Sequence, residues 1–237
     1  MESSHQKIKD DVRKAYNNIA QRYLEWTRAS HARRLSYLQD LLARLKAPQE
    51  DDVRKASVLE LGCGAGVPCT QVLASQDNLT VTANDISSAQ IALARQHLPP
   101  SSSVTLIESD MMELAFPDEQ FDAVIAMYSI IHLPRDEQVA LMKRIFQWLK
   151  PGGWFLANFC ATEYQGLTDP HWLGGTEGTM YWSAWGVDKN CAILTDIGFE
   201  LAIRDVVDEV EDDGNGDRII PFLWAMAKKA GRDKDMK

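Results

Sequence analysis

A glycine-rich loop at the end of a short apolar segment constrains the fold of this chain more than any other feature. Residues 57–61 have the composition of a buried strand, and residues 62–66 carry glycine at every second position. Glycine allows a sharp turn and lets a backbone approach a ligand closely. A strand that runs into such a loop and then into a helix is typical of nucleotide-binding α/β sheets.

Strand and helix patterns alternate after this loop. Further strands are expected at residues 79–83, 104–107, 121–127, 154–159, 199–207 and 219–227. Helices are expected between them at residues 87–98, with Ser87 as the cap, at residues 134–150, and at residues 188–198, with Asp188 as the candidate cap. A turn signal in residues 212–217 joins the last two strands as an antiparallel pair. The pattern predicts an α/β fold with a Rossmann-like, doubly wound, seven-stranded sheet that ends in this C-terminal antiparallel strand pair.

Two amphipathic helices are expected before the sheet, at residues 7–28 and 32–46. Together they form a predicted N-terminal helical lid, residues 1–50, on a domain that spans residues 51–230. An insert, residues 160–185, follows the fifth strand of that domain. Residues 231–237 are predicted to be a flexible tail.

The charge balance and the hydropathy pattern limit the partners of the chain. It has 25 Lys and Arg against 34 Asp and Glu, a net charge of -9. Because a phosphate backbone would be repelled, this balance argues against a nucleic-acid partner. No apolar run is long enough to span a membrane, and the N-terminus lacks the apolar core of a signal peptide. We therefore expect a cytoplasmic protein, a monomer or weak homodimer, with a small-molecule substrate.

The four cysteines give no sign of a metal site or of a disulfide framework. Their spacings are irregular and include no Cys-x-x-Cys pair, and they lie at Cys63, Cys69, Cys160 and Cys191. This pattern predicts reduced thiols and no bound metal.

The glycine spacing and a downstream carboxylate narrow the choice of nucleotide. Asp85 follows the second strand, where a ribose-binding carboxylate is expected. A dinucleotide loop places its third glycine three positions after its second, whereas Gly62, Gly64 and Gly66 step by two. No Lys-Ser/Thr pair follows, which excludes a phosphate-binding P-loop. A nicotinamide-dependent oxidoreductase is thus only a remote alternative.

The chain resembles the class I S-adenosylmethionine-dependent methyltransferases at five landmarks, which occur in the order of that family. The landmarks are residues 58–66, 84–87, 109–111, 114–122 and 149–153. The resemblance implies S-adenosylmethionine as cofactor, S-adenosylhomocysteine as its product, and methyl transfer as the reaction.

The resemblance also implies which residues bind the cofactor. Asp85 would accept both ribose hydroxyls, Asp110 would accept the adenine amine, and Ile86 would pack on the adenine. Glu60 and the glycine loop would hold the methionine end. The full implied set is Tyr16, Tyr23, Glu60, Gly62, Cys63, Gly64, Asp85, Ile86, Asp110, Met111 and Met127.

Tyr16 and Tyr23 lie two helical turns apart on the first predicted helix. In similar methyltransferases such a helix covers the cofactor, and an aromatic face favours a sulfonium cation. The alternative is an ordinary core stripe that packs the helix against the sheet.

His132 and Tyr128 follow the fourth strand, where the acceptor site is expected. His132 is the candidate general base because imidazole titrates near neutral pH, and Tyr128 is the second candidate catalytic residue. The alternative for His132 is a structural role in which it bonds a loop carbonyl. The Asn/Asp-Pro-Pro-aromatic motif of methyltransferases that act on nucleic acids and glutamine side chains is absent here, which disfavours macromolecular N-methylation.

The insert is rich in aromatic residues and glycines. This composition predicts a glycine-jointed lid over an apolar small molecule. A satellite core or a dimer face remains open as an alternative. The predicted substrate-binding residues are Trp26, His132, Phe159, Trp172, Met180, Tyr181 and Trp182.

Within the family, the second half of the chain is similar to fungal thiol S-methyltransferases that act on reduced epidithiodiketopiperazines such as dithiol gliotoxin. This similarity implies thiol S-methylation, with both thiols modified in succession. A thiol needs little help from a base, since it ionises near pH 8.5. Three alternatives stay open: an oxygen acceptor, an amine acceptor with His132 as base, and a cofactor-binding module without catalysis.

Overall fold

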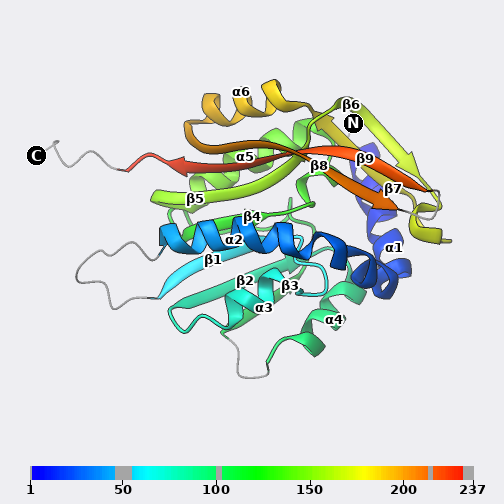
Figure 1. Ribbon diagram of the computed structural model, residues 1–237, viewed down its shortest axis with the longest axis horizontal. Helices are drawn as coiled ribbons and strands as arrows, with labels where there is room; N and C mark the ends of the chain where they lie inside the picture. Colours follow the sequence, from blue (N-terminus) through cyan, green and yellow to red (C-terminus); the bar gives the residue numbers. More distant parts are fainter. Residues whose placement is uncertain (1, 46–54, 100–102, 213–215, 232–237) are drawn as a thin grey trace, which may run out of the picture.

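A seven-stranded sheet in the order β3-β2-β1-β4-β5-β9-β8 forms the centre of the computed structural model, which describes residues 2–45, 55–99, 103–212 and 216–231 (Figure 1). Strands β1 to β5 run parallel, and β9 pairs antiparallel with both β5 and β8. The predicted fold class is therefore confirmed. The strands are β1 (Ala56–Leu61), β2 (Leu79–Asp85), β3 (Val104–Glu108), β4 (Phe121–Ala126), β5 (Leu149–Cys160), β8 (Phe199–Asp212) and β9 (Asp217–Lys229).

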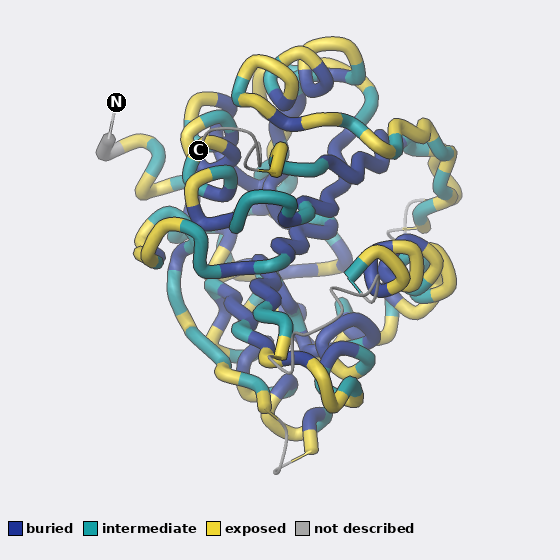
Figure 2. The backbone as a smooth tube through the Cα atoms, turned by 90° about the vertical axis from the view of Figure 1, so that its left-hand side faces the viewer, coloured by how far each residue is buried: buried dark blue, intermediate teal, exposed yellow. Residues whose placement is uncertain are grey.

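Helices pack on both faces of this sheet and leave a buried layer of strands between them (Figure 2). Leu38 and Leu41 of α2 and Leu73 of α3 are fully buried on one face. Ile145 of α5 and Leu194 of α6 are fully buried on the other. Burial of each such side chain contributes about 1.5–3 kcal/mol. The helices are α1 (Glu2–Trp26), η1 (Thr27–Ser30), α2 (His31–Leu45), α3 (Cys69–Ala74), α4 (Ser88–His97), η2 (Ile130–His132), α5 (Arg135–Trp148) and α6 (Val187–Ile197).

The predicted lid, residues 1–50, divides into two parts with different surroundings. Helix α2 belongs to the core layer, because its apolar stripe packs on the sheet. Helix α1 instead packs on α4 and on the insert, at the edge where the parallel strands end (Figure 1). Residues 46–50 lie outside the described part of the chain. Only α1 is therefore placed where a lid would be.

Most of the predicted element boundaries lie close to the observed ones. Ser87 caps α4, since its hydroxyl accepts a hydrogen bond from the Gln90 amide. Gly198 ends α6 with a φ of 114°. Strands β8 and β9 run further than predicted because their backbones pair along the whole hairpin. The predicted turn (212–217) and the predicted tail (231–237) each include residues outside the described part, namely 213–215 and 232–237.

Asp188 was expected to begin the last helix, but Gly186 holds the N-cap position of α6. Asp188 lies in the first turn, where a carboxylate is favoured by the helix dipole. It accepts a hydrogen bond from Arg204 of β8 at 2.7 Å. Asp188 therefore links the helix to the sheet edge instead of capping the helix.

The insert is not the loop that its glycines indicate. It forms a two-stranded antiparallel sheet from β6 (Glu163–Asp169) and β7 (Met180–Trp185), with the short helix η3 (Trp172–Gly174) between them. Leu173 and Met180 of the insert bury themselves against Val12, Ala15 and Ile19 of α1. Helix α1 and the insert thus form one packed unit. Among the described residues, no helix combines the length and the apolar character of a membrane span.

We predict that Gly178→Ala separates the insert from α1. A Cβ atom at Gly178 would lie 2.3 Å from the Asp11 carbonyl oxygen and 2.5 Å from the Ala15 nitrogen, which are backbone atoms that cannot yield. Gly152 is the matched control because its φ of 81° resembles the 71° of Gly178 while a Cβ there meets nothing. Gly152→Ala should cost about 1–2 kcal/mol from strain alone, and Gly178→Ala clearly more. Thermal unfolding measures both, and equal losses would contradict the packing of the insert on α1.

Candidate functional site

The glycine loop after β1 has a backbone that favours glycine. Gly62 and Gly64 have φ angles of 70° and 56°, in the left-handed region. A Cβ on Gly62 would lie 2.4 Å from the Ser129 Cβ, so the loop closely approaches the segment that follows β4. The loop therefore sits beside the expected acceptor region, as a site shared by two ligands requires.

Two buried carboxylates flank this loop. Asp85, at the end of β2, accepts hydrogen bonds from the Gly64 amide at 2.8 Å and the Ser87 amide at 2.9 Å. Burial raises the pKa of Asp85 to about 6, although these backbone bonds oppose the shift. Glu60 accepts a hydrogen bond from the Thr70 hydroxyl at 2.7 Å, and burial raises its pKa to about 7. Ile86 is half-buried next to Asp85.

Asp110, the expected adenine contact, lies in a small ionic cluster after β3. One of its oxygens accepts from the Met112 amide at 2.8 Å, and the other pairs with Lys9 of α1 at 2.7 Å. Lys9 also reaches Glu137 of α5 at 3.2 Å. Burial alone would lower the pKa of Lys9, but the two carboxylates more than offset it, so this pKa is raised. Met111 is half-buried and packs against the sheet core.

Helix α1 lies over the loops that follow β2, β3 and β4. Besides Lys9, it supplies Asn17, which accepts hydrogen bonds from the Ser87 hydroxyl at 2.7 Å and the Ala89 amide at 3.2 Å. It also supplies Tyr16, which bonds His132 at 2.8 Å. The cavity left between α1 and the glycine loop is about 20 Å³, room for about one water molecule. A nucleotide enters there only when α1 or its side chains shift.

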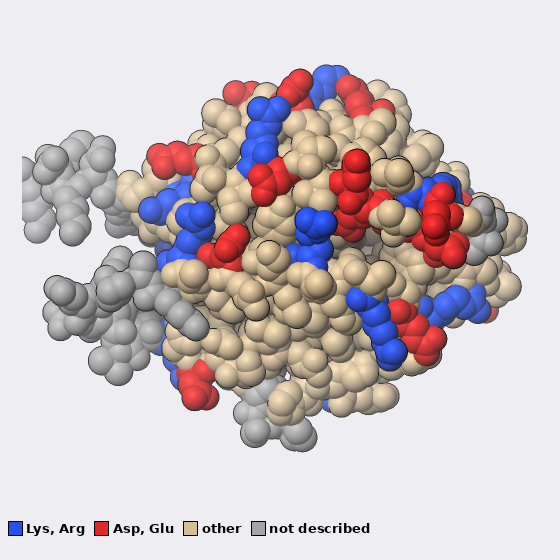
Figure 3. All heavy atoms as spheres, in the orientation of Figure 1, with Lys and Arg blue, Asp and Glu red and all other residues tan. Residues whose placement is uncertain are grey.

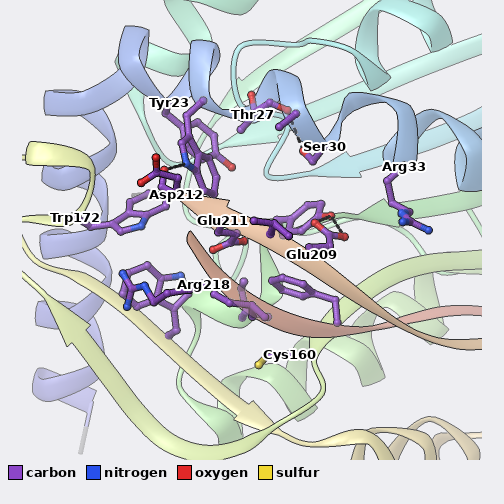
Figure 4. Close-up of a pocket in the computed structure, with 18 of the residues that line it drawn as sticks. Tyr23, Thr27, Ser30, Arg33, Cys160, Trp172, Glu209, Glu211, Asp212 and Arg218 are labelled. Carbon is purple, nitrogen blue, oxygen red and sulfur yellow. Dashed lines mark hydrogen bonds between the residues drawn. The ribbon is translucent and has the colours of Figure 1, made fainter. Parts of the chain in front are cut away.

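A second cavity, of about 920 Å³, lies between α1, the insert and the free end of the β8–β9 hairpin (Figure 4). Tyr23 and Trp172 face it in the close-up, opposite Glu209 and Glu211 of β8. The expected site residues that line it are Tyr16, Tyr23, Trp26, Tyr128, His132, Trp172 and Trp182. Except for Tyr128, their rings form a connected group around Trp172 and Tyr16, with neighbouring centroids 5.0–6.2 Å apart.

The structure does not place Phe159, Met180, Tyr181 and Met127 at either cavity. Phe159 and Met180 are each only 1 % exposed and lie in the packed cores. The Tyr181 hydroxyl donates to the Gln165 carbonyl, and Met127 packs in the sheet core beside a cysteine sulfur. For Phe159 and Tyr181 the reason is strand alternation. Successive side chains point to opposite faces, so the following residues, Cys160 and Trp182, line the cavity in their place.

His132 is buried, and both of its ring nitrogens are engaged. Nδ1 lies 2.8 Å from the Tyr181 carbonyl oxygen and therefore carries the proton, so Nε2 accepts from the Tyr16 hydroxyl at 2.8 Å. Burial lowers the pKa of His132 to about 4. The ring is neutral at pH 7, as a general base must be. Its unprotonated nitrogen, Nε2, already accepts a hydrogen bond from Tyr16.

Tyr128 is held in place on every side. Its φ is 53°, and its amide donates to the Asn158 side chain at 2.6 Å. Its hydroxyl donates to the Glu209 carboxylate at 2.6 Å, and the Arg34 guanidinium lies 4.3 Å from its ring centre. Burial raises the pKa of Tyr128 well above its usual value. Tyr128 is therefore a protonated wall residue whose hydroxyl already has an acceptor.

Three residues of the site escaped the sequence analysis: Arg34, Glu209 and Glu211. Arg34 sits on a helix whose leucine stripe indicated only core packing. Glu209 and Glu211 belong to an acidic run next to the predicted turn, and no role was predicted for them. Their two-residue spacing was the available signal, since it places both on one face of a strand.

The comparisons with known proteins agree with this geometry. Residues 58–153 match the family described as a methyltransferase domain. A sterol 24-C-methyltransferase of Neurospora crassa is 34% identical over 178 residues, which cover 72% of this chain and 45% of that enzyme. This chain spans less than half the length of three sterol 24-C-methyltransferases that it matches.

Solved structures share the fold over nearly the whole chain. A DhpI–SAH complex superposes with a TM-score of 0.66 at 23% identity, covering 96% of this chain and 99% of that one. The 1,6-didemethyltoxoflavin-N1-methyltransferase of Burkholderia thailandensis, with bound 1,6-didemethyltoxoflavin and S-adenosylhomocysteine, gives 0.65 at 18% identity, covering 97% and 90%. At these identities the likeness is one of fold.

We predict that Asp85→Asn weakens S-adenosylhomocysteine binding at least tenfold at pH 7.5, because the variant loses one of the two oxygens that we expect to accept the ribose hydroxyls. Since the pKa of Asp85 is about 6, wild-type affinity should fall as the pH drops through 6, and the variant should not show this fall. Isothermal titration calorimetry measures both. Glu108→Gln, an exposed change at the end of the neighbouring strand, is the control. A wild-type-like Asp85→Asn would exclude the ribose role.

We also predict that His132 destabilises the fold in acid. Its pKa is about 4 in the folded protein and about 6.5 when unfolded, so stability is lost as the pH falls from 6.5 toward 4. The full loss is about 3 kcal/mol. Urea unfolding of wild type and His132→Asn between pH 7.5 and 4.5 should converge as the pH falls. The exposed His171→Asn is the control, and parallel curves for wild type and His132→Asn would contradict a buried neutral ring.

Proposed function

We propose that this chain, which carries a class I S-adenosylmethionine-dependent methyltransferase domain in residues 58–153, methylates a small molecule bound in the 920 Å³ cavity. One observation carries the proposal. Tyr23, Thr27 and Arg34 line both this cavity and the small cavity at the glycine loop. A cofactor on the loop and an acceptor in the large cavity would meet across these three side chains. Such alignment supplies most of the rate gain in a simple displacement.

The residues at the glycine loop fit the expected cofactor. S-adenosylmethionine supplies an activated methyl group on a sulfonium centre. Asp85 and Glu60 offer buried carboxylate oxygens for its hydroxyl and ammonium groups. Arg34 adds a guanidinium whose Nε donates to Ser30 at 3.0 Å, and its remaining N–H groups suit the methionine carboxylate. Tyr23 offers an aromatic face toward the same space.

The acceptor atom is the open part of this proposal. The resemblance to fungal thiol S-methyltransferases makes a thiol, such as a reduced epidithiodiketopiperazine, one acceptor to test. A thiol needs little help from a base. It therefore suits a site where the candidate base is occupied, since His132 Nε2 already accepts a hydrogen bond from Tyr16. An oxygen or amine acceptor is the alternative, and it requires a base that reaches the cavity.

We expect mass spectrometry to detect one or more methyl additions when the protein is incubated with S-adenosylmethionine and a panel of small acceptors. The panel holds a reduced epidithiol, an aryl thiol, a phenol, a catechol and an aryl amine. Trp172→Ala, which removes a ring from the centre of the cavity, should raise KM at least tenfold. Trp185→Ala removes a ring of the same insert that does not line the cavity and is the control.

Two results would overturn this proposal. The first is the absence of methyl transfer to any member of the panel by a protein that binds S-adenosylhomocysteine. The second is activity that Trp172→Ala leaves untouched. If His132→Asn abolishes transfer to the phenol or amine but spares the thiols, the histidine acts as the base for those acceptors.

A further inference from the structure

The large cavity has two chemically different walls. One is aromatic, from α1 and the insert, with Tyr23, Trp26 and Trp172 in mutual contact. The other comes from the free end of the β8–β9 hairpin and carries carboxylates (Figure 4). Acidic side chains also gather on the outer surface over this end of the hairpin (Figure 3). Among the described residues, six carboxylates and three guanidiniums line the cavity: Asp169, Asp208, Glu209, Glu211, Asp212 and Asp217 against Arg33, Arg34 and Arg218.

Glu209 and Glu211 face inward from the same strand but have different partners. The Glu209 carboxylate accepts from the Tyr128 hydroxyl at 2.6 Å and from the Trp224 indole at 3.3 Å, so protein donors already occupy it. The Glu211 carboxylate has no hydrogen bond or ion pair with any residue in the described ranges. Arg34 of α2, which is half-buried, is directed onto the Tyr128 ring and Ser30.

We infer that Glu211 is the specificity-determining residue of this cavity and that it selects acceptor molecules that carry a basic nitrogen. The inference rests on the proposed function, because it names the substrate class of the same site. A protonated amine satisfies an unpartnered carboxylate with a charge-assisted hydrogen bond. It also gains from the electron-rich faces of the aromatic wall. A carboxylate ligand would be repelled by the same surroundings.

The charges around Glu211 set the pH dependence of this recognition. Glu209 and Asp212 lie on its own strand, Arg218 on β9, Arg34 on α2, Tyr23 on α1 and Tyr164 on β6. Burial raises the pKa of Glu211 to about 7, and Glu209 adds to this shift while the two arginines oppose it. A cationic ligand favours the ionised form. Binding near pH 7 should therefore release protons, and affinity should rise with pH up to about 8.

The test compares 2-phenylethylamine with 2-phenylethanol, a pair that differs in charge but little in shape. Binding to the protein saturated with S-adenosylhomocysteine is measured by ligand-observed NMR. Proton release is measured by calorimetry in two buffers of different ionisation enthalpy. We expect the amine to bind at least tenfold more tightly than the alcohol, with proton release at pH 7. Glu211→Gln should remove both effects without changing the affinity for the alcohol.

Two variants separate recognition from general effects of charge. Glu211→Asp keeps the carboxylate and should retain part of the preference for the amine. Glu200→Gln removes one exposed charge from the same strand, away from the cavity, and should change nothing. Equal binding of the two probes, binding of neither, or a preference that survives Glu211→Gln would overturn the inference. Failure to bind S-adenosylhomocysteine in the first place would instead count against the proposed function.

Discussion

The seating of α1 across the carboxyl ends of the parallel strands is the interaction on which the site depends. Four contacts hold it there, each to a different part of the fold. Lys9 pairs with Asp110 after β3, Asn17 caps the start of α4 after β2, Tyr16 bonds His132 after β4, and the Trp26 indole donates to the Asp212 carbonyl at 2.7 Å. Together with the small core that α1 shares with the insert, these contacts place α1 over the small cavity at the glycine loop and along one side of the large cavity.

The same seating explains why the acceptor cavity has two unlike walls. Its apolar wall exists because α1 and the insert share a small core and present their remaining aromatic rings to the other side. Its carboxylate wall exists because β8 and β9 extend past the sheet, where only one face of each strand is covered. The alternating pattern of β8 leaves Glu209 and Glu211 half-buried at the cavity, whereas the side chains of Val206 and Val210 are exposed.

Buried carboxyls give the surroundings of the glycine loop and the wall of the large cavity a common electrostatic character. The pKa values of Glu60, Asp85 and Glu211 are all raised, chiefly by burial. Ionising these groups costs stability as the pH rises through their folded pKa values, because each is ionised more easily in the unfolded chain. A ligand that donates hydrogen bonds or carries positive charge recovers that cost. The arrangement is thus better matched to donor and cationic ligands than to anions. Arg34, which lines both cavities, is a cation and would instead attract an anionic group.

Much of the fold followed from the sequence, because local rules decide it. The glycine loop, the apolar strands and the Ser87 cap each depend on neighbouring residues, and all three were predicted. The antiparallel hairpin followed from its turn signal, and the aromatic nature of the large cavity followed from composition.

The placement of single side chains did not follow from the sequence. Phe159 and Tyr181 were assigned to the cavity when strand register turns them away, and Asp188 was assigned to a cap that Gly186 occupies. Arg34, Glu209 and Glu211 reach the site only because α2, which covers one face of the sheet, and β8, the edge strand of that sheet, lie close together although they are far apart in sequence. The sequence by itself thus determined which chemistry the domain carries, whereas tertiary packing decided which side chains meet the ligand, because side-chain direction depends on register and on partners distant in the chain.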